Sequence, residues 1–176
     1  MVGATPGPGS TFEELRLEGV RRAMEDHFGQ DARRIRHALR VTDFARQLLE
    51  QEEGEAELVL ATALLHDVGI REAERKYGSS AGPLQEQEGP PLARAILESL
   101  GYPPAFIDEV CSIIASHHSP GEVDTANFRL VWDADWLVNL PDECNLEHRE
   151  HTAALIDRIF LTSTGAGLAR NLYLKR

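Results

Sequence analysis

The chain contains few cysteines, and it lacks long apolar runs. Its two cysteines, Cys111 and Cys144, do not form a CxxC or other metal-binding pair, so we expect a reduced, cytoplasmic protein. No apolar run reaches the roughly 18 residues that a membrane-spanning helix needs, which argues against a membrane protein. Residues 1–10 lack the basic region and the apolar core of a signal peptide.

Positively charged residues are outnumbered. There are 18 Lys and Arg residues against 29 Asp and Glu residues, which gives a formal net charge of −11. A charge of this sign argues against binding along the phosphate backbone of a long nucleic acid. An anionic substrate would need a local positive charge, which a bound metal ion supplies.

Alternating apolar and polar residues, the pattern of β-strands, are also scarce. The length of 176 residues and the 42% hydrophobic content suit one globular domain. We predict a flexible tail at residues 1–10, rich in Gly and Pro, and one all-α domain over residues 11–176. A capping box of Thr11 with Glu14 begins the first helix, and Asp31 caps the second. Helices are expected over residues 11–28, 31–53, from 55 onward, around 92–97, and over 104–116, 127–140, 146–161 and 165–174.

The segment at residues 77–91, YGSSAGPLQEQEGPP, interrupts the helical pattern. Its Gly, Ser and Pro content predicts an irregular region. A loop of this length in a compact domain is more often functional than idle. We interpret it as a lid that closes over the substrate or as a solvated connector. The nearness of Tyr77 and the glycines to the apolar helix that starts near residue 55 favours the lid.

Ionisable side chains interrupt four otherwise apolar segments. These are IRHALRV with His37, ALLHDVGI with His66 and Asp67, IIASHHS with His117 and His118, and LVWDADWLVNL with Asp133 and Asp135. Taken alone, His37 would be a hydrogen-bonded core histidine and Asp133 a solvated helix residue. The histidine pair of IIASHHS would complement a helix dipole. Asp67 is harder to explain, because a buried carboxylate needs a cation or several hydrogen-bond donors.

Together, the four segments favour a metal site. Imidazole nitrogen and carboxylate oxygen suit Mn, Fe, Co and Ni, and with fewer imidazoles Mg. The set contains no thiolate, which argues against a structural zinc site. His66 and Asp67 point about 100° apart on a helix, so they reach one ion only if it lies between helices, with Asp67 bridging to a second ion. Facing helices of a bundle commonly build metal sites in this way.

The order His37, His66-Asp67, Asp135 resembles the H…HD…D signature of the HD-domain metal-dependent phosphohydrolases. RIRHALRVTDFAR is similar to the first-histidine helix of the family, LLHDVGI to its HD helix and VWDADWLVNL to its last-aspartate helix. The similarity extends over about residues 12–174. It implies a single helical bundle around one or two divalent metal ions. The family's last ligand follows an alanine, which fits Asp135 better than the other aspartate of that helix.

Some branches of the superfamily hold two metals through two further histidines. The SHHS segment matches the second of these at His117, with His118 nearby. The first would stand in QEGPPLARAIL, where this chain has Glu88. The resemblance therefore implies a second ion held by Asp67, Glu88 and His117, and a site with one ion remains equally open.

The resemblance also implies hydrolysis of a phosphoester or phosphoanhydride bond in a small phosphorylated substrate, for which the family suggests a nucleotide. A divalent ion lowers the pKa of a bound water. We expect Asp67, beside His66 in the catalytic pair, to orient that water and accept its proton. Arg40 lies one turn from His37 and is expected to bind a phosphate oxygen, with a solvated surface charge as the alternative.

One departure from the family concerns a phosphate contact. The chain reads HDVGI where many members read HDxxK. We expect Arg71, Lys76 or Arg40 to replace that lysine, and we also assign His118 to substrate binding. Long nucleic acids and membranes are excluded as partners, and a homodimer is retained as a candidate assembly.

Two other functions stay open. Some enzymes of this fold are diiron oxygenases, but they rely on the extra histidine that Glu88 replaces. A ligand-sensing domain with a vestigial metal site is the other alternative. The retained His37, His66, Asp67 and Asp135 argue against it.

Overall fold

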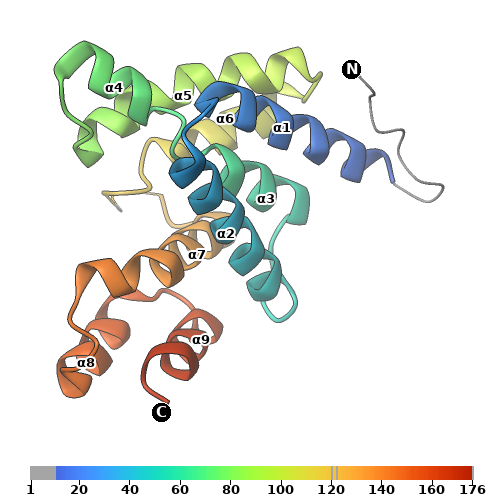
Figure 1. Cartoon of the computed structure of the whole chain (residues 1–176). Coiled ribbons are helices and arrows are strands. Elements are labelled where there is room, and N and C mark those ends of the chain that lie inside the picture. Colours follow the sequence, from blue (N-terminus) through green and yellow to red (C-terminus); the bar gives the residue numbers. More distant parts are fainter. Residues whose placement is uncertain (1–10, 120, 122, 176) are drawn as a thin grey trace.

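The computed structural model describes residues 11–119, 121 and 123–175, which form nine α-helices and no strand (Figure 1). The all-α prediction is therefore confirmed. The helices are α1 (Phe12–Phe28), α2 (Ala32–Leu49), α3 (Ala56–Leu65), α4 (Ile70–Tyr77), α5 (Gly82–Ser99), α6 (Pro104–Ile114), α7 (Ala126–Glu143), α8 (Arg149–Ile159) and α9 (Ser163–Tyr173). The tail predicted at residues 1–10 lies outside the described residues.

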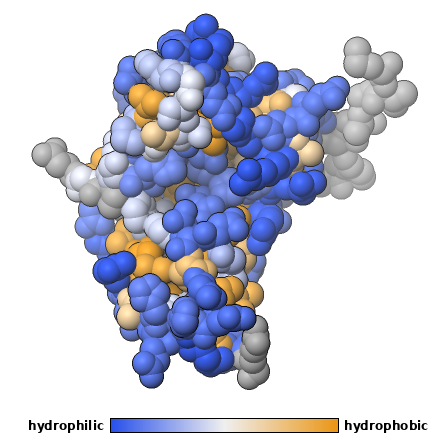
Figure 2. Space-filling model, turned by 60° about the vertical axis from the view of Figure 1, so that its left-hand side comes forward, coloured by the Kyte–Doolittle hydropathy of each residue, from blue (hydrophilic) through white to orange (hydrophobic). Residues whose placement is uncertain are grey.

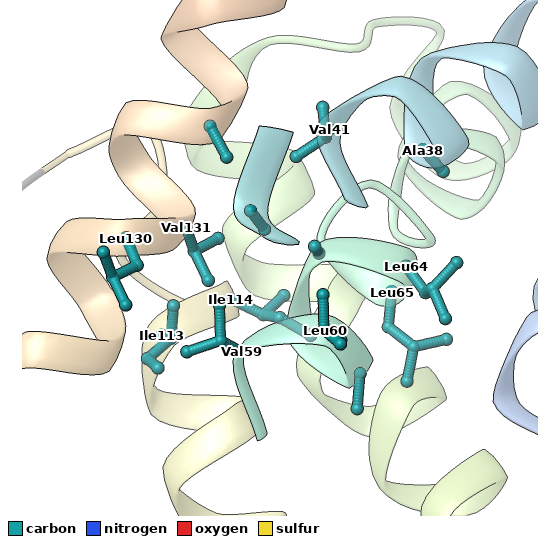
Figure 3. Close-up of a cluster of buried hydrophobic side chains, with 14 of the residues drawn as sticks. Ala38, Val41, Val59, Leu60, Leu64, Leu65, Ile113, Ile114, Leu130 and Val131 are labelled. Atoms are coloured by element: carbon teal, nitrogen blue, oxygen red, sulfur yellow. The ribbon is translucent and has the colours of Figure 1, made fainter. Parts of the chain in front are cut away.

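α3 forms the centre of the core. Every residue over 58–65 is buried, and a helix that is apolar on all sides must be surrounded by other elements. It packs against α1, α2, α6 and α7, and Figure 1 shows it among them. Figure 3 shows side chains of this core: Val59, Leu60, Leu64 and Leu65 of α3, Ala38 and Val41 of α2, Ile113 and Ile114 of α6, and Leu130 and Val131 of α7. This packing fixes the end of α3, which His66 follows.

Two predicted helix caps are present. Thr11 Oγ1 accepts a hydrogen bond from the Glu14 backbone N–H at 3.2 Å, and Glu14 Oε2 accepts one from the Thr11 N–H at 2.7 Å. Asp31 Oδ1 accepts a hydrogen bond from the Arg34 N–H at 3.2 Å. Such caps satisfy N–H groups that have no partner inside the helix. Local sequence therefore sets the start of α2, and with it the position of His37.

The prediction of an irregular region over residues 77–91 is wrong for most of that segment. α4 reaches its first residue, Gly78 turns the chain with a left-handed φ of 64°, and residues 82–91 are already part of α5. Pro83 lies in the first turn of α5, where its missing N–H would have no helical partner in any case.

Two further prolines, Pro90 and Pro91, lie inside α5 and remove hydrogen bonds from its backbone. Tertiary packing compensates for this loss. Gln85, Glu88 and Gly89 follow helical spacing and are buried, and α5 packs against both α4 and α6. A segment anchored in this way is part of the scaffold rather than a loop lid.

The first of the two aspartates of α7 is structural. Asp133 is fully buried and accepts hydrogen bonds from the N–H of Leu161 at 2.8 Å, the N–H of Thr162 at 2.9 Å and the hydroxyl of Thr162 at 2.7 Å. Its interpretation as a solvated helix residue is therefore wrong, because these donors compensate for its burial. A Cβ on Gly165 would lie 2.3 Å from Asp133 Oδ2, so glycine is needed there. The contacts attach the turn between α8 and α9 to α7.

The face of the molecule shown in Figure 2 is mostly hydrophilic. Its main group of hydrophobic residues lies just below the middle of the molecule. None of the described helices is long and apolar enough to cross a membrane.

Candidate metal centre

Side chains from α2, the end of α3 and α7 converge on one point. His37 Nε2 lies 3.1 Å from Asp135 Oδ1, 3.3 Å from His66 Nε2 and 3.4 Å from Asp67 Oδ2. His66 Nε2 lies 3.5 Å from both carboxylates. Ligand atoms held at about 2.1 Å from one ion stand about 3.0 to 3.5 Å from each other. The spacing of the two histidines from each other and from the two carboxylates is therefore that of metal ligands.

The end of α3 explains why His66 points inward. His66 is the C-cap of that helix and is completely buried. Its Nδ1 lies 2.7 Å from the Ala63 carbonyl oxygen. Because a carbonyl can only accept, Nδ1 carries a hydrogen, which leaves Nε2 directed at His37 and the carboxylates. A histidine held by its other nitrogen in this way is typical of metal ligands.

His117, just after the end of α6, is held in the same way as His66. Its Nδ1 donates to the Ile114 carbonyl oxygen at 2.6 Å. Its Nε2 is buried and has no hydrogen-bond partner among the described residues. The nearest acidic atom is Asp67 Oδ1 at 3.5 Å. A buried lone pair aimed at a carboxylate is unfavourable unless a cation lies between them, so His117 also fits a metal ligand.

Asp67 is shared between two clusters of donor atoms. Its carboxylate joins His37 and His66 in one cluster, and His117 and His118 in the other, with the atoms of each cluster within 4.8 Å of one another. The structure therefore places Asp67 where a bridging ligand would lie.

Burial and charge act in opposite directions in this site. Burial would lower the pKa of His66, but Asp67 and Asp135 outweigh it and raise that pKa to about 10. Burial would raise the pKa of Asp67, but the nearby His66 lowers it to about 2. Burial likewise opposes ionisation of Asp135, whose pKa is nonetheless held well below its usual range by His37 and His66. Two buried carboxylates thus stay charged and attract a cation, and the donor set fits a divalent metal ion.

Glu88, the predicted second-site ligand, is not brought to either cluster. It is buried, and it accepts hydrogen bonds from Lys76 Nζ at 2.6 Å and from the Tyr77 hydroxyl at 2.9 Å. The lysine and the tyrosine supply the charge and the donor that the buried carboxylate needs. Lys76, a predicted phosphate contact, is thereby paired with Glu88. Arg71 is also occupied, because it donates to the backbone carbonyl of His27.

A cleft of about 790 Å³ opens onto three of the four converging side chains. His37, Asp67 and Asp135 line it, together with two residues predicted to bind substrate, Arg40 and His118. Its size lies in the range of small-molecule sites. Burial, followed by the neighbouring His117, lowers the pKa of His118 to about 4, so this imidazole is neutral near pH 7.

Sequence reasoning missed three residues that support the site. Asn139 donates to Asp135 Oδ1 at 2.8 Å, and its position one turn after Asp135 could have revealed it. Gln85 Oε1 lies 3.0 Å from His118 Nε2, and His27 Nε2 donates to the carbonyl oxygen of the residue after Asp67 at 2.8 Å. Both contacts join segments far apart in the chain and have no local sequence signal.

Two comparisons with known proteins found a match. The family model of the HD domain matches residues 34–160. A crystal structure of a predicted HD superfamily hydrolase from an uncultured Thermotogales bacterium is 26% identical, with a TM-score of 0.61. The match covers 91% of this chain and 84% of that one. No curated protein matches the sequence.

Proposed function

The chain belongs to the HD domain family, and on that premise we propose that it is a metal-dependent phosphohydrolase acting on a small phosphorylated substrate of the nucleotide class. The bond cleaved is a phosphoester or a phosphoanhydride. One observation carries the proposal: His37 Nε2 and His66 Nε2 each lie 3.1 to 3.5 Å from Asp67 and Asp135, beside a cleft that arginines also line.

Most of these residues would serve as metal ligands. His37, His66, Asp67 and Asp135 would hold one divalent ion, and Asp67 with His117 would hold a second. An ion bound there supplies Lewis acidity, which lowers the pKa of water and neutralises charge on a phosphoryl group. His66 and His117 keep their Nδ1–H groups on backbone carbonyls, which fixes both rings.

The reaction also needs a proton acceptor and a group that binds the phosphoryl oxygens. Asp67 has one oxygen toward His37 and the other toward His117, so it lies between the two clusters, where it would orient the attacking water and, through an oxygen that holds no ion, accept its proton. Arg40 lines the cleft one turn after His37 and would donate to the phosphoryl oxygens. His118, neutral near pH 7, would serve as a hydrogen-bond partner or ligand rather than as a cation.

The test combines metal content with turnover. We would purify the chain without chelator or nickel affinity resin, measure metals by elemental analysis, and assay a phosphodiester and a panel of nucleotides. In Asp67→Asn we expect metal content and hydrolysis to fall together, with turnover lowered at least about 100-fold, because a shared ligand and proton acceptor is lost. Asp43→Asn is the matched control, since Asp43 is exposed on α2 and, among the described residues, pairs only with Arg46.

Two results would contradict the proposal. Asp67→Asn with the turnover of the original chain would remove Asp67 from the mechanism. Oxygen uptake with bound iron, without phosphate release, would indicate the oxygenase alternative instead. About two ions per chain would support the second cluster at His117, and about one ion would confine the site to the first.

A further inference from the structure

Four arginines of α2 line the cleft beside the candidate metal centre, and one of them, Arg34, is paired with Asp31 and Glu74. Arg33, Arg36 and Arg40 are spaced three and four residues apart, so they lie along one face of the helix. All three are exposed, and all three line the cleft with His37. We name them the arginine row.

Most of the described arginines form ion pairs, but those of the arginine row do not. Ion pairs are found for Arg16, Arg21, Arg22, Arg34, Arg46, Arg75, Arg94, Arg129 and Arg170. Arg71, Arg149 and Arg158 also lack one among the described residues, but they do not stand together on one helix face. Among the described residues, no carboxylate lies within ion-pair distance of Arg33, Arg36 or Arg40. Acidic groups are available near this end of α2, but Asp31 and Glu74 both pair with Arg34, at 3.0 and 2.6 Å. In a chain with a net charge of −11, neighbouring arginines without partners indicate a site for an anion.

The position of the row relative to His37 suggests the shape of that anion. Arg33 lies four residues before His37 and Arg40 three residues after it, so the two stand one turn away on either side. The row spans about 10 Å along the helix axis. Repulsion among the guanidinium groups favours spreading them along an extended anion rather than gathering them on one phosphate.

The rest of the cleft confines the anion to the α2 side. Asp31, Asp142 and Glu143 also line the cleft, and Asp142 and Glu143 belong to the end of α7. Within the described structure, none of these carboxylates is within ion-pair distance of the arginine row. They would repel phosphate groups, so an anionic chain is best accommodated along α2.

We propose that Arg33 and Arg36 bind further phosphate groups of the substrate, on the side of the metal centre opposite Arg40. The substrate class is then a compound with a linear chain of at least three phosphates, rather than a monophosphate or a simple diester. This inference rests on the proposed function for the cleavage step. The binding that it requires can be measured without turnover.

The test is calorimetric titration of inorganic tripolyphosphate, and separately of orthophosphate, into the full chain at low salt and a fixed free Mn²⁺ concentration. In Arg33→Gln/Arg36→Gln we expect tripolyphosphate affinity to fall at least about tenfold and orthophosphate affinity less than about twofold. The tripolyphosphate affinity of the original chain should also decrease with added salt more steeply than that of the variant. Arg158→Gln is the control, because Arg158 is also exposed and has no ion pair among the described residues, but belongs to α8.

The outcomes separate this inference from the proposed function. Equal losses for both ligands, no loss for tripolyphosphate, or an original chain that binds tripolyphosphate no better than orthophosphate would each overturn it. The proposed function fails separately, if no phosphate bond is cleaved by the metal-loaded chain. If both hold, the ratio of kcat/KM for a nucleoside triphosphate to that for a diester falls in the double variant.

Discussion

His27 connects the corner between α1 and α2 to the turn that carries Asp67. Its Nε2–H donates to the Val68 carbonyl oxygen at 2.8 Å, and the guanidinium of Arg71 donates to the backbone carbonyl oxygen of His27. Burial is the largest influence on its pKa and lowers it below the usual 6.5. The folded chain therefore holds His27 neutral at a pH at which the unfolded chain has begun to protonate it.

The sign of the resulting pH dependence follows from proton uptake. Below about pH 6.5 the unfolded state binds more protons at His27 than the folded state does, so acid lowers the free energy of unfolding. We expect this loss to be smaller in His27→Gln, whose amide can still donate to Val68. Urea unfolding at pH 7.5 and 5.5, with chelator present, measures it. His151→Gln, at an exposed position of α8, is the control. An unchanged pH dependence in His27→Gln would contradict the argument.

The two aspartates of α7 show how far the sequence predicts the role of a single residue. Asp133 and Asp135 are about 200° apart around the helix, so the sequence predicts that only one faces His37. The resemblance to the family selects Asp135, and the structure places it 3.1 Å from His37. The partners of Asp133 lie at residues 161 and 162, and its burial depends on tertiary contacts that no local pattern displays.

At the scale of elements, the turn after α3 and the first half of α5 approach each other closely. A Cβ on Gly69 would lie 2.5 Å from the Gln85 carbonyl oxygen and 2.6 Å from the Gly89 nitrogen. The φ of Gly69 is −70°, which any residue can adopt, so this glycine is required by space and not by backbone conformation. The backbone of α5 thus lies directly against the turn of the HD pair.

We expect Gly69→Ala to lower the free energy of unfolding by about 1 to 3 kcal/mol, because backbone on both sides must move to admit the methyl group. Gly167→Ala is the control, and it should change the free energy of unfolding in the opposite direction. It lies inside α9 with open space where the added methyl group would point, and alanine should stabilise that helix by up to about 1 kcal/mol. Thermal unfolding of both variants measures the difference. Equal stability of Gly69→Ala and the original chain would contradict the close approach.

The same region explains where sequence reasoning fails at this scale. Most helices follow an apolar periodicity that predicts them nearly to their ends. The first half of α5 buries Gln85, Glu88 and Gly89 instead of apolar side chains, and it contains Pro90 and Pro91. Neither composition nor periodicity marks such a helix, because tertiary packing outweighs its poor local propensity. The position of Glu88 could not be read from the sequence either, since its partner Lys76 comes from α4.

At the scale of the whole molecule, the metal centre joins α2, α3 and α7, which also pack around the core. Order along the chain and the HD pair predict that these helices meet. A divalent cation bound there would be an additional link between them, because two carboxylates that stay charged lie beside His37 and His66. Binding to the folded state alone stabilises it, by about 2.7 kcal/mol at a free metal concentration 100 times the Kd.

For a chain of this size we expect saturating Mn²⁺ to raise the Tm by about 5 to 10 °C. Differential scanning calorimetry of chelator-treated protein, with metal added stepwise, measures the shift. His37→Ala should lose it, because His37 contacts every other member of the first cluster. Glu88→Gln should lower the starting Tm, since Glu88 pairs with Lys76, yet keep the full metal-dependent shift. A shift that survives in His37→Ala and disappears in Glu88→Gln would place the ion at α5 and not where the three helices meet.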